Sequence, residues 1–409
     1  SELGLNYEIY IPDRQKEGYG PNNESFQYFI NKNVKLIFTV DCGTLSFEAI
    51  EFAKKNDIDV IVLDHHQSEI KLPKAFSIVN PNRIDDKSNL QYLCAAGVTF
   101  MFLVSINREL RSNNWFNKNK INEPNLINFL DLVSLGTVCD VVPLTGLNRA
   151  IVKQGLKIIQ SKKNLGIKTL LSICNIDTNP STYHLGYMLG PRINAGGRVG
   201  KCSHGANLLL NKDPKYSFKL ASELDQFNKE RQILEKDLLQ KILNKTKNYL
   251  NDSVLILSGS NWHEGVIGIV AARLKDKFNK PTILISFDGN IGKASARSIV
   301  GFDIGSVIIA ASHENILLKG GGHKMAGGFS IKLENVEKFK KFISKKFESI
   351  NENLKIDKPL LVDSIISPSA VNIEFYKKVA LLSPFGSGNP EPKFVIEDLK
   401  TINGKIVGE

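Results

Sequence analysis

The first half of the chain alternates between short apolar runs and segments with apolar residues at helical spacing. Runs rich in β-branched residues predict strands at 7–13, 34–40 and 58–64. Residues 46–56 place apolar side chains every three or four positions, which predicts a helix between the second and third strands. Strands separated by helices of this length form parallel sheets that are covered on both faces. We therefore expect an α/β domain in this half.

The predicted strands end in ionisable residues. Asp41 follows the second run directly, and Asp64 ends the third, where it is followed by His65 and His66. Ligands bind at the carboxyl ends of the strands in sheets of this kind, so Asp41 and Asp64 are expected at the same edge. An isolated Asp-His-His triplet also occurs by chance in surface turns. The expectation of a site therefore depends on the neighbours of the triplet.

A further carboxylate, Asp140, interrupts the apolar run at 132–144. A lone buried carboxylate is costly, so Asp140 either caps backbone groups or binds a cation. Three carboxylates and two imidazoles at the ends of apolar segments outline a two-metal site for displacement at phosphorus. Oxygen-rich ligation with one or two imidazoles favours Mn²⁺ or Mg²⁺ over Zn²⁺. The adjacent Cys42 and Cys139 are interpreted as core residues, because neighbours in a strand face opposite sides.

The second half begins with a long amphipathic helix, predicted from about 214 to 250, whose length suits a connector between two domains. A second α/β unit follows, with strands at 254–258 and 281–287, a helix at 268–278, and a hairpin at 288–290. A basic helix near 337–349 is interpreted as a solvated face. From about 359 onward the chain returns to short strand-like runs.

Two segments combine several glycines with polar side chains. They are 189–200, with Arg192, Asn194 and Arg198, and 317–330, with Gly321, Gly322 and His323. Both suit an anion site formed by backbone N–H groups and charged side chains, but a flexible loop or a tight turn has the same composition. Between them lie His263 and Arg297, which are further candidate contacts. His263, beside Trp262, is equally well explained as a partly buried structural residue.

Composition limits the class of protein. A chain of 409 residues suggests two to three domains, and 42% hydrophobic with 23% charged residues is typical of a globular protein. No apolar run is long enough to cross a bilayer. The net charge of +11 favours a polyanionic partner, although a Lys-, Ile- and Asn-rich sequence also reflects genome composition. Five cysteines without metal or disulfide spacing indicate a reducing cytoplasm.

The order of the motifs resembles the RecJ family of the DHH phosphoesterase superfamily over nearly the whole chain. The motifs that carry the resemblance include "TVDCG", "LDHHQ", "GTVCDVVPL", "GPRINAGGR", "WHEGVIG", "GGGHKMAGG" and "PFGSGNPEP". The resemblance implies an α/β fold with a parallel-sheet DHH domain, a long connecting helix, a smaller α/β DHHA1 domain, and the start of a β (OB-fold) domain. We expect these at 1–205, 206–250, 251–355 and 356–409.

The resemblance also assigns roles to residues. It implies metal ligation by Asp41, His65 and Asp140, while Asp64 and His66 complete the catalytic motif, with His66 suited to the scissile phosphate. Together with the candidates above, the expected substrate-binding residues are Arg14, Arg192, Asn194, Arg198, His263, Ser295, Arg297, Gly321, Gly322 and His323.

The implied activity is metal-dependent 5′-to-3′ hydrolysis of single-stranded DNA in repair and recombination, with two Mn²⁺ or Mg²⁺ ions in the full-length protein. The family's Asp-x-Asp motif is expected upstream of Ser1, as is a strand before the helix end at Gly4, so the activity of this segment alone stays open. A short-oligonucleotide or cyclic-dinucleotide phosphodiesterase and an inactive nucleic-acid-binding scaffold are the alternatives. We expect a cytoplasmic monomer without membrane contact, which replication or repair proteins could bind.

Overall fold

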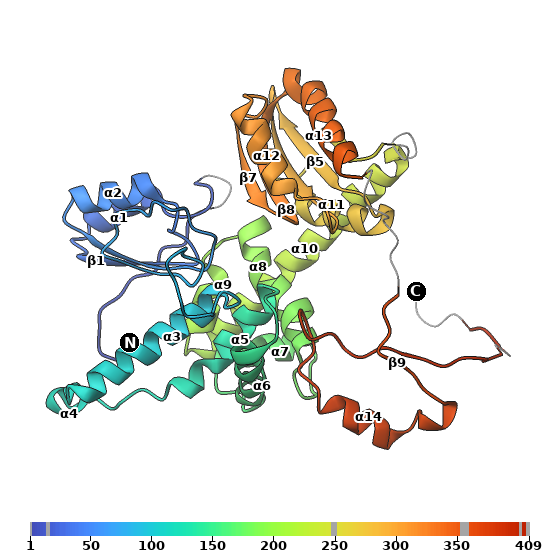
Figure 1. Cartoon of the computed structure of the whole chain (residues 1–409). Coiled ribbons are helices and arrows are strands. Elements are labelled where there is room, and N and C mark those ends of the chain that lie inside the picture. Colours follow the sequence, from blue (N-terminus) through green and yellow to red (C-terminus); the bar gives the residue numbers. More distant parts are fainter. Residues whose placement is uncertain (1, 14–16, 247–251, 352–359, 401–402, 406–409) are drawn as a thin grey trace. The chain divides into compact units, whose positions relative to one another are not determined.

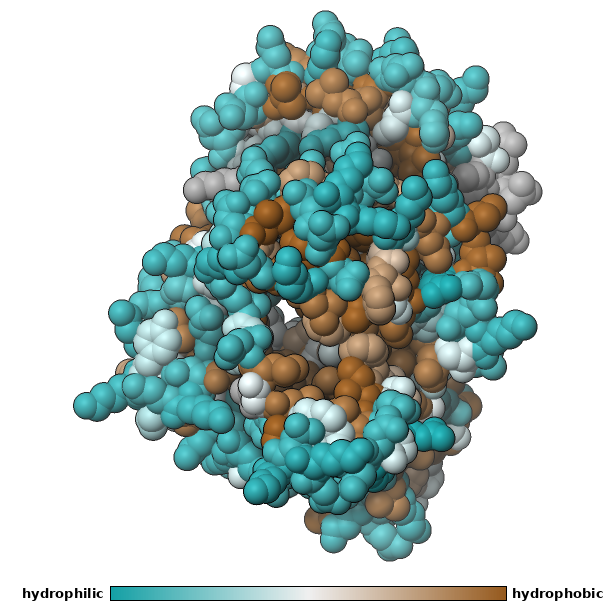
Figure 2. All heavy atoms as spheres, turned by 90° about the vertical axis from the view of Figure 1, so that its left-hand side faces the viewer, coloured by the Kyte–Doolittle hydropathy of each residue, from teal (hydrophilic) through white to brown (hydrophobic). Residues whose placement is uncertain are grey.

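The computed structural model describes residues 2–13, 17–246, 252–351, 360–400 and 403–405 (Figure 1). The chain divides into two compact units. Unit 1 comprises Ser1–Gly197, Cys202–Glu223 and Leu360–Glu409, and unit 2 comprises Arg198–Lys201 and Leu224–Pro359. Among the described residues, no helix is both long and apolar enough to cross a membrane. Figure 2 shows a largely hydrophilic face on which hydrophobic residues are exposed in several places.

Unit 1 begins with a parallel sheet in the order β1-β2-β3, which confirms the two strands expected at 34–40 and 58–64. Buried apolar side chains, among them Ile50 and Val62, pack the sheet against two helices. The helix expected at 46–56 is also confirmed. The bounds are α1 Asn23–Ile30, β1 Leu36–Val40, α2 Phe47–Lys55, β2 Asp59–Leu63 and β3 Ser77–Val79.

The strand expected at 7–13 is wrong. These residues have no regular secondary structure, and the side chains of Tyr7 and Ile9 are 60% and 49% exposed. A β-branched, aromatic run forms a strand only where a neighbouring strand accepts its backbone hydrogen bonds. The described residues 7–13 have no such neighbour.

From Ala95 to Leu210 unit 1 is mainly helical, and α3, α5 and α6 share an apolar cluster that includes Phe100, Val133 and Ile151. The flexible loop that was the alternative interpretation of 189–200 is wrong, because most of this segment forms α8. Gly190 explains the packing: a Cβ atom there would lie 2.5 Å from Cys139 Sγ. The bounds are α3 Ala95–Ser112, α4 Trp115–Asn119, η1 Leu126–Phe129, α5 Leu130–Cys139, α6 Gly146–Gln160, α7 Leu165–Ile173, η2 His184–Leu189, α8 Gly190–Val199 and α9 His204–Leu210.

The long connecting helix is confirmed as α10, Pro214–Thr246, and the last expected residues of this helix lie outside the described part of the chain. Unit 2 then forms a five-stranded sheet in the order β4-β5-β6-β8-β7, in which only β4 and β5 pair in parallel. The bounds are β4 Leu255–Ser260, α11 Glu264–Phe278, β5 Thr282–Asp288, β6 Ile291–Arg297, α12 Ile304–His313, β7 Lys319–His323, β8 Ala326–Lys332, η4 Leu333–Asn335 and α13 Val336–Asn351.

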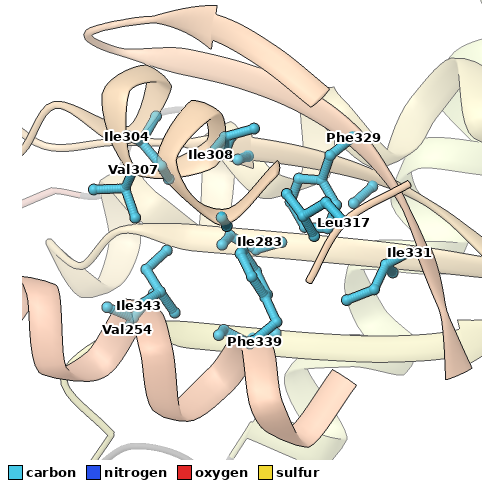
Figure 3. Close-up of a cluster of buried hydrophobic side chains, with 14 of the residues drawn as sticks. Val254, Ile283, Ile304, Val307, Ile308, Leu317, Phe329, Ile331, Phe339 and Ile343 are labelled. Carbon is cyan, nitrogen blue, oxygen red and sulfur yellow. The ribbon is translucent and has the colours of Figure 1, made fainter. Parts of the chain in front are cut away.

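Alternating residues of the unit 2 strands face two separate cores. Leu255 and Leu284 pack with side chains of α10 and α11, whereas Val254 and Ile283 pack with those of α12 and α13 (Figure 3). The helices expected at 268–278 and 337–349 and the hairpin at 288–290 are therefore confirmed within α11, α13 and the β5–β6 turn.

The glycine-rich segment 317–330 forms the β7–β8 hairpin, which agrees with the tight turn that was one of its two interpretations. Cβ atoms at Gly320 and Gly327 would lie 2.7 and 2.5 Å from atoms of Ile308, so these glycines let α12 lie close to the hairpin. At the C-terminal end of the described chain, β9 (Ser364–Ile365) and β10 (Phe394–Val395) form a short parallel pair. η5 (Pro368–Ala370) and α14 (Ile373–Ala380) lie between them. The four domain boundaries stay predictions.

Candidate metal centre at the strand ends

Asp41 lies immediately after β1 and faces the end of the neighbouring strand. Its backbone N–H donates to Leu63 O at 3.0 Å, which continues the β1–β2 ladder by one residue. The residue then adopts a left-handed conformation with φ 61°, which Asp tolerates better than most residues. Gly43 follows at φ +113°, and a Cβ there would lie 2.4 Å from Thr39 Oγ1. The turn therefore needs glycine two residues after Asp41.

Asp64 is buried and organises the Asp-His-His motif. Its carboxylate accepts the N–H of His65 at 2.8 Å, the N–H of Thr44 at 3.1 Å and the Nδ1–H of His66 at 2.7 Å. Burial alone raises the pKa of Asp64, but the hydrogen bonds from His66 and Thr44 outweigh it and hold the pKa well below its ordinary value. The carboxylate is therefore ionised. Nδ1 of His66 carries the proton of this hydrogen bond, so Nε2 is the ring nitrogen whose lone pair could bind a metal ion.

His65 brings together the two carboxylates expected as metal ligands. Its Nε2 lies 3.2 Å from Asp41 Oδ1 and 3.6 Å from Asp140 Oδ2. Ligand atoms at adjacent positions around one octahedral ion with 2.0–2.1 Å bonds lie about 3 Å apart. One ligand atom each from Asp41, His65 and His66 also lie within 4.8 Å of one another. The geometry and the oxygen- and nitrogen-rich donors fit a divalent ion such as Mn²⁺ or Mg²⁺.

The charges at this rim favour a cation. Burial by itself lowers the pKa of His65, but the hydrogen bond to Asp41 and the charge of Asp140 outweigh it, so the pKa is raised. The pKa of His66 is raised chiefly by its hydrogen bond to Asp64. Burial raises the pKa of Asp140. Protons and a metal ion therefore compete for these ligand atoms.

Asp140 reaches the rim from a helix rather than a strand. It is the C-terminal cap of α5, where its N–H donates to Gly136 O at 2.9 Å. Asp140 also borders a cavity of about 690 Å³, whose lining includes Asp41, Phe100, Cys139 and Asn194. Asn194, on α8, is therefore the one expected substrate contact in unit 1 that lines this cavity among the described residues.

Sequence reasoning missed a group of residues that supports the motif. Asn80 is buried and donates to Thr44 Oγ1 and to His66 O, both at 2.8 Å. Asn82 donates to His65 O at 2.6 Å. Both asparagines follow β3, and the parallel pairing of β3 with β2 brings them to the edge of the sheet where the motif lies. Tyr19 also contacts the rim, with its hydroxyl on Asp41 O and its ring edge against His66.

The interpretation of Cys42 and Cys139 as core residues of strands is wrong. Cys42 is half-buried in a turn, and Cys139 is an exposed residue at the end of a helix. Their thiol groups are nevertheless shielded, which raises the pKa of Cys42 to about 12 and that of Cys139 to about 11. Mn²⁺ and Mg²⁺ prefer oxygen ligands to soft thiolates, so neither cysteine is assigned to the ion.

Unit 2 gathers several of the expected substrate contacts on one face of its sheet. Across β6, β8 and β7, Arg297 lies opposite Ala326, which lies opposite His323. Two residues along β6, Ser295 lies in the same way in line with Gly321. Residues opposite one another on paired strands share a face, as do alternate residues of one strand. Arg297 Nη1 donates to Ser295 Oγ at 3.2 Å, and burial lowers the pKa of this guanidinium. A Cβ at Gly321 would meet no atom within 4 Å, so this face is open there.

Other expected contacts have structural partners within the chain. Arg192 donates to Met188 O at 2.9 Å, and Arg198, grouped with unit 2, donates to Gly265 O at 2.9 Å. His263 caps α11, where its Nδ1 accepts the N–H of Gly265. A Cβ at Gly322 would meet backbone atoms of the hairpin at 2.5 Å, so this glycine permits close packing. Arg14 lies outside the described residues.

Three sequence-family models match the chain. The DHH family, N-terminal domain, matches residues 2–137, the DHHA1 domain matches 251–349, and the RecJ OB domain matches 362–409. These matches confirm the expected fold class: a parallel-sheet DHH domain, a DHHA1 domain and part of an OB domain.

Two curated relatives are both described as single-stranded-DNA-specific exonuclease RecJ. The protein from Haemophilus influenzae is 33% identical over 419 residues, which cover 100% of this chain and 72% of the relative. The Escherichia coli protein is 35% identical over 419 residues, covering 99% of this chain and 72% of the relative.

Solved structures agree with this likeness. RecJ from Thermus thermophilus in complex with Mn²⁺ matches with a TM-score of 0.77 at 29% identity, over 92% of this chain and 54% of that one. The same protein in complex with Mg²⁺ matches with a TM-score of 0.69 at 28% identity, over 88% of this chain and 50% of that one. The chain thus spans about half the length of these two structures.

Proposed function

Because the chain belongs to the RecJ family of single-stranded-DNA-specific exonucleases, we propose that it hydrolyses phosphodiester bonds of single-stranded DNA in a metal-dependent reaction. The observation that carries the proposal is the convergence of Asp41 and Asp140 on His65 Nε2 at the carboxyl edge of the sheet. A divalent ion held there would supply an activated water and neutralise charge on the phosphate. We also propose that degradation proceeds from the 5′ end.

The chain's own residues have distinct roles in this proposal. Asp41, His65 and Asp140 hold the ion, while Asp64 fixes the ring of His66 and the backbone of His65. His66, whose Nδ1 is held by Asp64, offers a ring nitrogen near the ligand atoms of Asp41 and His65 and contacts the scissile phosphate or the ion. In unit 2, Arg297 with Ser295 provides a desolvated guanidinium and a hydroxyl that suit a phosphate of the strand. Asn194 and the polar residues around Gly321 and His323 are proposed as further strand contacts.

The test is digestion of long single-stranded DNA labelled at either end, with Mn²⁺ or with chelator. Wild type is expected to release a labelled mononucleotide at once from 5′-labelled DNA, and a shrinking ladder from 3′-labelled DNA. His65→Ala and Asp140→Ala should each lower the rate by about 100-fold or more, since second-shell changes alone cost 10- to 100-fold. Equal rates in wild type and both variants would remove the metal centre from the proposal.

Matched controls exist in the same chain. Asp59 is exposed at the opposite end of β2, and His313 is exposed in the last turn of α12. Asp59→Ala and His313→Ala remove the same side-chain types without touching the rim, so both should retain wild-type rates. Comparing a long strand with a trinucleotide separates a processive exonuclease from a short-oligonucleotide phosphodiesterase.

We further propose that single-stranded DNA is the principal partner and that the chain acts as a cytoplasmic monomer, with replication or repair proteins as candidate additional partners. The net charge of +11 supports the DNA partner. All five cysteines are free, which is consistent with a reducing compartment. Light scattering after size-exclusion chromatography tests the monomer, and a DNA affinity that falls steeply with salt tests the electrostatic contribution.

A further inference from the structure

The segment 384–391, from the motif "PFGSGNPEP", packs against the loop that follows Asp140. The backbone N–H of Leu144 donates to Ser387 O at 2.7 Å, and Thr182 Oγ1 donates to Phe385 O at 2.7 Å. All of these residues belong to unit 1. Leu144 is only 2% exposed, so its backbone N–H would be an unsatisfied buried donor without Ser387. The contact is therefore part of the folded structure of the loop.

Two glycines of the segment make the contact tight. A Cβ at Gly386 would lie 2.7 Å from Leu144 Cδ1. Gly388 has φ +68°, and a Cβ there would lie 2.8 Å from Pro143 Cβ. Contacts below 3.0 Å force a displacement, because Pro143 and the buried Leu144 have little freedom to move. Glycine at both positions lets backbone lie directly on the loop.

The loop between Asp140 and Leu144 needs such support. Val141 directly follows Asp140 and has φ 59°, a conformation that is a genuine outlier for a β-branched residue. Residues held in this region cost about 1–3 kcal/mol each and persist only where the surroundings fix them. The side chain of Val141 is 70% exposed, so its own burial does not fix it. At the far end of the loop, Asn148 Nδ2 donates to Pro143 O at 3.0 Å.

We propose that residues 384–391 are a positioning segment that holds Asp140 at the distance from His65 needed to bind the divalent ion. The inference rests on the proposed metal-dependent function. The segment acts through Pro143 and Leu144 and does not itself contact the reacting groups. Asp140 Oδ2 already lies 3.6 Å from His65 Nε2, which exceeds the spacing of about 3 Å between adjacent ligand atoms of one octahedral ion. A relaxed loop would move the carboxylate out of reach.

The experiment uses the 409-residue chain without DNA and two variants that disturb the contact. Gly388→Ala introduces the clash with Pro143, and Thr182→Val removes the hydrogen bond to Phe385. The controls are Gly404→Ala, where a Cβ would meet no atom within 4 Å, and Thr182→Ser, which keeps the hydroxyl. Mn²⁺ affinity is measured from the electron paramagnetic resonance signal of the unbound ion. Hydrogen exchange of the metal-free proteins reports on residues 141–148 and on the sheet.

Gly388→Ala and Thr182→Val are expected to weaken Mn²⁺ binding by about 10-fold or more, the usual effect of losing an outer-shell partner. Exchange of the Leu144 amide should rise, while exchange in the three strands of unit 1 that form its parallel sheet stays unchanged. Both controls should remain within about twofold of wild type in affinity, which is less than the smallest outer-shell effect.

Two results would overturn the inference and leave the proposed function standing. One is faster exchange of the loop with unchanged Mn²⁺ affinity, which would make the contact purely structural. The other is unchanged exchange of the loop in both disruptive variants. If the wild-type chain itself binds no Mn²⁺, the metal centre fails, and this inference is refuted with it.

Discussion

Replacement of Asp64 by Asn tests whether one buried carboxylate holds the whole motif together. The substitution keeps the shape of the side chain and removes its charge. The carboxylate accepts hydrogen bonds at both oxygens: Oδ2 from the N–H of Thr44, and Oδ1 from the N–H of His65 and from Nδ1 of His66. An amide has only one acceptor oxygen, so its NH₂ group must face at least one of these donors.

The magnitude follows from the less damaging orientation of the amide. With its oxygen in place of Oδ1, the NH₂ group opposes the backbone N–H of Thr44, which leaves buried donors unsatisfied at a cost of about 1–3 kcal/mol. The hydrogen bond to His66 also loses its charge assistance, which is worth about 1 kcal/mol more. We therefore expect Asp64→Asn to destabilise unit 1 by about 2–4 kcal/mol.

Hydrogen exchange of the strand amides of unit 1 measures this loss directly, because exchange through unfolding scales with the population of the open state. A loss of about 2–4 kcal/mol corresponds to exchange about 30 to 700 times faster, at tenfold per 1.4 kcal/mol. Asp59→Asn, at the exposed start of the same strand, is the control and should exchange like wild type. Exchange of Asp64→Asn within about threefold of wild type would refute the reasoning.

Three further predictions follow from charged groups. The pKa of Asp64 is lower in the folded state, so its stabilisation is present above its ordinary pKa of about 4 and is lost as the pH falls toward the folded value; acid unfolding of Asp64→Asn should show a shallower pH dependence. The pKa of His65 is raised, so protons compete with the metal for this ligand. As the pH falls, the Mn²⁺ affinity measured by titration should begin to decline before the pH reaches about 6.5, and the decline should be up to about tenfold per pH unit. On α10, Glu235→Gln breaks the buried pair with Arg231 and should cost about 3–5 kcal/mol in urea unfolding, whereas Asp237→Asn, in an exposed pair, should cost less than about 0.5 kcal/mol. Equal costs for the last two variants would contradict the role of burial.

The candidate site was largely predictable because it depends on strand ends. Period and composition identify β1 and β2, and parallel pairing places the residues after them at one edge. Asp41 and the Asp64 motif therefore converge as expected, so the proximity of Asp41 to His65 could be predicted from the sequence. Asp140 was identified only as a carboxylate that interrupts an apolar run. Its position at the end of a helix, rather than a strand, required the tertiary structure.

The supporting residues were harder to predict because their role depends on pairing between distant segments. Asn80 and Asn82 read as an ordinary polar turn, yet they hold the backbone carbonyls of both histidines. Nothing in their own neighbourhood separates such asparagines from those of a solvated loop. Only the pairing of β3 with β2 brings them to the motif.

The secondary structure of the glycine-rich segments was also hard to predict from the sequence. Residues 189–200 and 317–330 have similar composition, but one forms a helix and the other a hairpin. Glycine permits many conformations, so its presence predicts close approach without indicating what approaches. Cys139 packs against the glycine that begins the helix, and Ile308 packs against the glycines of the hairpin. In both segments the neighbouring element, which composition alone does not reveal, decides whether the glycines form a helix or a hairpin.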